Sequence, residues 1–110
     1  MSQDAMYLIH ILQAIEKIGS YTVDGKDNFS RDLKTQDAVI RNFEIIGEAV
    51  KRIDRSVKDR RPDIPWRQIA GLRDVLIHDY MGVDVVEVWN VVEHHLPALR
   101  AAVTFLIANP

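Results

Sequence analysis

The fold is decided first by residues 34–55, which read KTQDAVIRNFEIIGEAVKRIDR. Apolar side chains recur in this stretch at alternating steps of four and three residues, at Val39, Phe43, Ile46, Val50 and Ile53. Because an α-helix has about 3.6 residues per turn, this spacing places all of them on one face. The stretch therefore predicts a long amphipathic helix near residues 34–55 that packs against other helices.

Upstream of this helix, residues 4–18 show a second helical pattern. Its apolar positions are Ala5, Leu8, Ile11, Leu12, Ile15 and Ile18. Gly19 follows where a left-handed cap is expected. Residues 20–28 are rich in turn formers and lack periodicity, so they predict a loop between the two helices.

Downstream, Pro62 and Pro65 interrupt any helical continuation, which predicts a loop over about 56–64. Proline suits the first turn of a helix, so a third helix is expected from Pro65 to about His78, ending before Gly82.

The last segment predicts helical structure from Asp84, a good N-cap, to the C-terminal end. Its apolar seam contains Val85, Val88, Val92, His95, Leu99, Ala102 and Leu106. Pro97 interrupts the run, so we expect a kink or two abutting helices over 84–96 and 97–108. Since no stretch alternates with period two, the fold class is all-α: one domain over residues 1–110, a bundle of four or five helices.

Composition excludes several kinds of site. The chain has no cysteine, so it has no disulfide, thiolate metal site or cysteine nucleophile. No apolar run approaches the roughly 20 residues that a membrane span needs, and the N-terminal stretch lacks a basic leader. We therefore expect a cytoplasmic protein without a membrane partner.

Positive charge is concentrated in residues 51–73. This segment holds eight basic and three acidic residues, a net charge of +5, which leaves −7 for the rest of a chain whose formal charge is −2. Such a segment is a candidate for binding phosphates of a nucleic acid, although solvated charged faces are also common. The candidate RNA-binding residues are Arg55, Arg60, Arg61 and Arg67.

Residues 66–80, which read WRQIAGLRDVLIHDY, carry the candidate chemistry. They resemble the signature of HEPN ribonucleases, in which an arginine and a polar residue precede a histidine, and the HepT branch adds a tyrosine two positions later. Arg73, Asp74, His78 and Tyr80 match these positions. The resemblance extends to residues 41–49, RNFEIIGEA, and to residues 83–97, and so covers nearly the whole chain.

The resemblance implies a HEPN-type bundle that forms a homodimer with its site at the symmetric interface. It also implies a toxin that cleaves RNA and whose partner is a minimal nucleotidyltransferase antitoxin of the MntA type. This partner would transfer AMP to Tyr80. HEPN domains also serve as non-catalytic, substrate-binding or dimerisation partners of nucleotidyltransferases, so that function is the alternative. A helical scaffold without a role in RNA chemistry is a weaker third option.

Elementary chemistry explains why these residue types suit RNA cleavage. Internal transfer requires a proton to leave the 2′-hydroxyl, a proton to reach the 5′-oxygen, and stabilised charge on the phosphate. Histidine exchanges protons near neutral pH, and arginine offers a planar fork for phosphate oxygens. His78 is therefore the predicted proton-transfer residue and Arg73 the predicted phosphate clamp, with neither cofactor nor metal required.

The spacing of the motif raises a geometric problem. On an ideal helix Arg73 and Tyr80 diverge by roughly 20°, whereas Arg73 and His78 diverge by roughly 140°. Either the helix ends near His78, or Arg73 and His78 of two subunits meet across an interface. Asp74 lies four residues before His78, so it is expected to share its face and orient the imidazole.

Two further groups of polar residues are ambiguous. Glu44 and Glu48 are one turn apart, and are either surface residues or partners of Arg73. The cluster of Glu93, His94 and His95 lacks the spacing of helical metal motifs, so we expect no metal there. His95 falls on the apolar seam and is expected in the core or at an interface.

Overall fold

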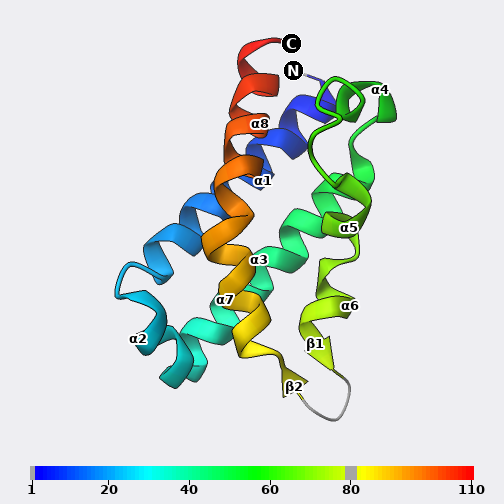
Figure 1. Ribbon diagram of the computed structural model, residues 1–110. Helices are drawn as coiled ribbons and strands as arrows, with labels where there is room; N and C mark the ends of the chain where they lie inside the picture. Colours follow the sequence, from blue (N-terminus) through cyan, green and yellow to red (C-terminus); the bar gives the residue numbers. More distant parts are fainter. Residues whose placement is uncertain (1, 79–81) are drawn as a thin grey trace.

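Long helices running side by side form the body of the protein, as the computed structural model in Figure 1 shows for residues 2–78 and 82–110. They are α1 (Gln3–Tyr21), α3 (Leu33–Arg52), and the consecutive pair α7 (Val85–His94) and α8 (Leu96–Ala108). Helix α1 packs against both α3 and α8. The predicted all-α class is confirmed.

Shorter elements complete the chain. They are α2 (Gly25–Arg31), α4 (Arg55–Lys58), α5 (Trp66–Ala70), α6 (Leu72–Leu76), and the two-residue strands β1 (Ile77–His78) and β2 (Gly82–Val83). The strands pair antiparallel, with Ile77 opposite Val83 and His78 opposite Gly82. Helices α5 and α6 both pack against α3.

Helix α3 confirms the prediction made from its apolar spacing. The five seam residues of α3 and its C-cap, Val39 to Ile53, are each at most 3% exposed. The helix begins after Asp32, whose side chain accepts a hydrogen bond from the backbone N–H of Lys34 at 3.1 Å. The buried face of α3 and its N-terminal cap are therefore both determined by residues within the helix or directly before it.

The predicted loop over residues 20–28 is wrong in its bounds, because only residues 22–24 form the turn between two helices. Helix α1 continues through Gly19 to Tyr21, and α2 begins at Gly25, whose φ is +87°. Phe29 of α2 is fully buried and lies against Trp89, with 5.5 Å between ring centroids. Burial of one aromatic ring therefore stabilises a short helix that has no periodic pattern of its own.

The prediction of one third helix from Pro65 to about His78 is also wrong, because two short helices, α5 and α6, occupy this stretch and a strand follows them. Helix α5 ends at Ala70 with Gly71 as its C-cap, and α6 ends at Leu76. The backbone then pairs with β2, and the N–H of Asp84 donates to the carbonyl of Leu76 at 2.8 Å. Gly82, at φ +74°, supports the return of the chain. The predicted loop over 56–64 is likewise shortened by the single turn of α4.

The C-terminal segment follows the prediction of two abutting helices. The Asp84 side chain accepts from the N–H of Glu87 at 3.1 Å, and the axes of α7 and α8 are bent by 46° at His95. His95 itself is exposed, so the core alternative predicted for it is wrong, whereas a place at an interface stays a prediction. Among the described residues, no single helix is both long and apolar enough to cross a membrane; α7 and α8 meet that test only as a bent pair.

Candidate active site

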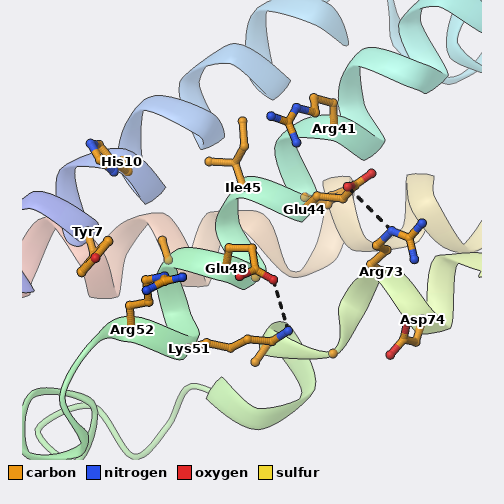
Figure 2. Close-up of a pocket in the computed structure, with 15 residues that line it drawn as sticks. Tyr7, His10, Arg41, Glu44, Ile45, Glu48, Lys51, Arg52, Arg73 and Asp74 are labelled. Carbon is orange, nitrogen blue, oxygen red and sulfur yellow. Dashed lines mark hydrogen bonds and ion pairs between the residues drawn. The ribbon is translucent and has the colours of Figure 1, made fainter.

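A cleft of about 520 Å³ lies between α1, α3, α5 and α6. Figure 2 shows its wall, which carries acidic and basic side chains side by side. Its polar and charged lining residues are Tyr7 and His10 from α1, Arg41, Glu44, Glu48, Lys51 and Arg52 from α3, and Arg73 and Asp74 from α6. Arg73 and Asp74 of the predicted motif therefore lie in this cleft.

A glycine contact sets the position of the motif on α3. A Cβ atom added to Gly47 would lie 3.2 Å from the carbonyl oxygen of Ala70 and 3.4 Å from that of Ile69. A side chain at this position would require the end of α5 to move away from α3 by a few tenths of an ångström, so glycine favours the close approach. Since α6 follows directly after Gly71, this approach brings Arg73 next to the middle of α3.

Glu44 is the partner of Arg73. The guanidinium Nε lies 3.7 Å from the carboxylate Oε2, and the side chains are 58% and 33% exposed. Figure 2 shows the two groups pointing toward each other. Of the two interpretations of Glu44, the structure supports the second, a partner of Arg73. Glu48 instead pairs with Lys51 at 3.3 Å, so it is a surface residue at the cleft and not a partner of Arg73.

The backbone between Arg73 and His78 is not one straight helix. Because α6 ends at Leu76, His78 belongs by its backbone to β1. The premise that Asp74 shares a helical face with His78 is therefore wrong. Asp74 is exposed, and its carboxylate points away from the Arg73–Glu44 pair in Figure 2. Predictions for the side chain of His78 and for Tyr80 lie outside what the structure describes.

The basic segment does not form one stripe. Lys51 and Arg52 line the cleft, whereas Arg60 and Arg61 contact the end of α8. Arg60 donates to the carbonyl of Asn109. Arg67 is exposed, and the Arg55 side chain is 90% exposed, with its guanidinium 4.0 Å from Asp59.

Arg61 is the most constrained cation of this segment. It donates two hydrogen bonds to Asp63, of 3.0 and 2.9 Å, and its guanidinium lies 5.3 Å from the ring centroid of Phe105. These hydrogen bonds raise the pKa of Arg61 and lower the pKa of Asp63. A phosphate would have to compete with Asp63 for this guanidinium.

Sequence reasoning missed the part of the cleft built from Tyr7, His10, Arg41 and Arg52. The available signal was the face of α3 beside its apolar seam. Arg41, Glu44, Glu48 and Arg52 follow one another at steps of three, four and four, which is the spacing of one helix face.

His94, at the end of α7, contacts its neighbour in the sequence. His94 Nε2 lies 3.1 Å from Glu93 Oε1, and both side chains are exposed. In the part of the chain that the structure describes, no group of three or more His, Asp or Glu side chains is placed to hold a metal ion.

Comparison with known proteins places this chain in a family. Residues 11–106 match the family described as "Ribonuclease HepT-like". The "Probable ribonuclease HepT" of Thermococcus cleftensis is 48% identical over 95 residues, which cover 86% of each chain. A "Putative RNase" of Methanocaldococcus jannaschii is 38% identical over 95 residues, which cover 86% of this chain and 82% of the relative.

A longer relative contains a similar region. It is the "Gamma-glutamylcyclotransferase and putative RNase" of Methanocaldococcus jannaschii, 45% identical over 96 residues. These cover 86% of this chain but only 43% of that relative. No solved structure gave a significant match.

Proposed function

Because the chain belongs to the family of HepT-like ribonucleases, we propose that it cleaves RNA without a metal ion, with Arg73 and His78 as its catalytic residues. The observation that carries the proposal is the family match over residues 11–106, which includes the whole motif. It is supported by Arg73 of that motif, which lies partly exposed in a charged cleft.

The proposed reaction transfers the phosphate within the RNA chain. The 2′-oxygen loses its proton and attacks phosphorus, the bond to the 5′-oxygen breaks, and the leaving oxygen takes up a proton. The products are a 2′,3′-cyclic phosphate and a free 5′-hydroxyl. His78 moves the protons, and Arg73 stabilises the charge on the phosphate oxygens.

Glu44 has a positioning role in this scheme. It holds the guanidinium of Arg73 in the cleft through Nε, in a partly solvated ion pair. The terminal nitrogens of the guanidinium can then donate bidentate hydrogen bonds to a phosphate while Glu44 keeps its position. Glu48 has no such role, because it pairs with Lys51. Asp74, which also lines the cleft, is proposed as an orienting group at its rim. Arg55, Arg60, Arg61 and Arg67 are proposed to bind the RNA backbone further away.

The biological setting that we propose is a toxin–antitoxin pair. The chain is the toxin and acts as a homodimer, and a nucleotidyltransferase antitoxin of the MntA type silences it by transferring AMP from ATP to Tyr80. Since ATP is the AMP donor, the pair is expected in the cytoplasm. The added phosphate is negatively charged and would compete with RNA for the cationic cleft.

The decisive experiment incubates the purified chain with total RNA in the presence of EDTA. We expect cleavage that leaves 2′,3′-cyclic phosphate ends, and a loss of at least about a hundredfold in His78→Ala and Arg73→Ala. Arg73→Lys is the matched variant, and it should stay impaired because lysine lacks the planar fork.

The opposite result has a defined meaning. If the wild type leaves RNA intact while it still binds its nucleotidyltransferase, the chain is a non-catalytic helical partner or a substrate-binding subunit of that enzyme. Cleavage that continues in His78→Ala would instead reject His78 as the proton-transfer residue.

A further inference from the structure

Two arginines of the cleft have no acidic partner among the described residues. Arg41 and Arg52 are exposed and line the cleft on the same face of α3. Between them lie Glu44 and Glu48, each in an ion pair with a different cation, Arg73 or Lys51. Within residues 2–78 and 82–110, neither Arg41 nor Arg52 makes an ion pair or a side-chain hydrogen bond.

The spacing of these arginines fits an extended polyanion. Eleven residues of helix place them about 16 Å apart along the axis of α3. That distance is too long for both to bind one phosphate, but it suits separate phosphates of one strand. Glu44 lies between the two arginines along α3, and Arg73 faces it from α6 at the side of the cleft (Figure 2). A strand that runs along α3 and reaches both arginines therefore passes beside the proposed catalytic guanidinium.

The facing helix presents flat rings. Tyr7 and His10 of α1 line the same cleft, and their rings meet edge to face with 6.2 Å between centroids. The His10 side chain is exposed and that of Tyr7 is half-buried. Histidine and tyrosine rings are surfaces on which unpaired bases stack in complexes with single-stranded RNA.

Building on the proposed ribonuclease function, we propose that the cleft binds single-stranded RNA lengthwise along α3. Arg41 and Arg52 hold phosphates on either side of the scissile one, and a base stacks on the rings of Tyr7 and His10. A duplex keeps its bases stacked on each other and offers none to these rings. The substrate class that follows is unpaired RNA.

The test measures RNA binding in a His78→Ala background, in which the RNA stays intact. A fluorescent single-stranded oligonucleotide of mixed sequence is titrated at salt concentrations from about 50 to 200 mM. Arg41→Gln and Arg52→Gln should each weaken binding and lower the slope of log affinity against log salt by about 0.7. Arg100→Gln, an exposed cation of α8 outside the cleft lining, is the matched control and should change neither.

The role of the Tyr7 and His10 rings can be tested independently of the arginines. His10→Ala should weaken binding by at least about fivefold, whereas His10→Phe, which keeps a ring but carries no charge, should retain the affinity. A duplex of the same sequence should compete poorly with the labelled strand. Equal competition by the duplex, or equal losses in both His10 variants, would overturn the assignment of the rings.

Failure of this inference can be told apart from failure of the proposed function. If the His78→Ala parent protein binds no RNA, both the proposed function and this inference are rejected. If the parent protein binds RNA but Arg41→Gln and Arg52→Gln keep its affinity and salt slope, only the proposal that RNA binds along α3 in this cleft is rejected. A change of oligomeric mass in these arginine variants, measured by light scattering, would also overturn it, because Arg41 and Arg52 would then hold subunits together instead of RNA.

Discussion

Arg73 of α6 and Glu44 of α3 form an ion pair across the cleft, with 3.7 Å between Nε and Oε2. The contact joins the proposed phosphate clamp to the helix that forms the centre of the core. Because both side chains are partly exposed, water screens the attraction and the pair adds little to stability, about 0 to 1 kcal/mol. Its importance therefore lies in where it holds the guanidinium.

Glu44→Gln should separate RNA binding from RNA cleavage. Removing a carboxylate beside the phosphate site is expected to raise RNA affinity by up to about fivefold. The turnover rate should fall, since Arg73 loses the group that positions it. Binding by anisotropy and single-turnover cleavage check the two effects, and Glu48→Gln serves as the control that leaves Arg73 paired. An unchanged turnover rate would remove Glu44 from the mechanism.

Gly47→Ala should impair activity more than stability. The added methyl group meets the Ala70 carbonyl at 3.2 Å and must displace the end of α5, and with it Arg73. Helix propensity offsets this strain by about 1 kcal/mol, so the free energy of unfolding changes little. Gly19→Ala is the control: its Cβ meets nothing within 4 Å, and it should gain stability without loss of cleavage. Full activity in Gly47→Ala would show that the close approach is dispensable.

Mixing inactive subunits tests whether the site is shared in a homodimer. Light scattering at micromolar concentration is expected to give the mass of a dimer. If Arg73 of one subunit works with His78 of the other, an equimolar mixture of Arg73→Ala and His78→Ala subunits should regain about a quarter of the wild-type activity. No recovery after complete subunit exchange would place both residues of each site in one chain.

The AMP acceptor is tested by mass spectrometry. Incubation with the cognate nucleotidyltransferase and ATP should add the mass of AMP to the wild type and abolish cleavage. Tyr80→Phe should gain no such mass and should stay active, because it keeps the ring and loses only the hydroxyl. Tyr21 is 40% exposed, so Tyr21→Phe is the control and should be modified as the wild type is. Equal modification of Tyr80→Phe would exclude Tyr80 as the switch.

Acid should weaken the start of α3. Hydrogen bonding from the Thr35 hydroxyl, at 2.8 Å, lowers the pKa of Asp32 below its ordinary value of 3.8. A depressed pKa stabilises the fold above the unfolded-state pKa, and this contribution is lost as pH falls below 3.8 through the folded-state value. Thermal melts across this range should show a smaller pH dependence in Asp32→Asn, which keeps the cap without the charge.

Thr35→Val checks the cause of that shift. It removes the hydroxyl donor, so the pKa of Asp32, followed by NMR, should return toward 3.8. If the pKa of Asp32 stays equally low in this variant, the hydroxyl is not what depresses it.

The sequence by itself determined the elements whose signals are local. The apolar seam of α3 recurs every three or four residues, and Asp84 caps α7 by accepting from the N–H of Glu87, three residues later. Both signals lie within one or two helical turns, so the spacing of residues in the sequence was enough to predict them. The same holds for the break before Pro97 and for the assignment of Arg73 and His78 as the candidate catalytic residues. Their chemistry follows from residue type, and the family match includes their motif. The dimer and the roles of Tyr80 and the basic segment stay predictions.

Tertiary structure decided what depends on contacts between distant residues. Burial of Phe29 against Trp89 made a helix where the turn-forming residues predicted a loop. Strand pairing after Leu76 ended α6 before His78, and the close approach at Gly47 set Arg73 opposite Glu44. The cleft between α1 and α3 likewise depends on packing between helices. Periodicity reports which face of a helix is buried, but it carries no information about which helix covers that face.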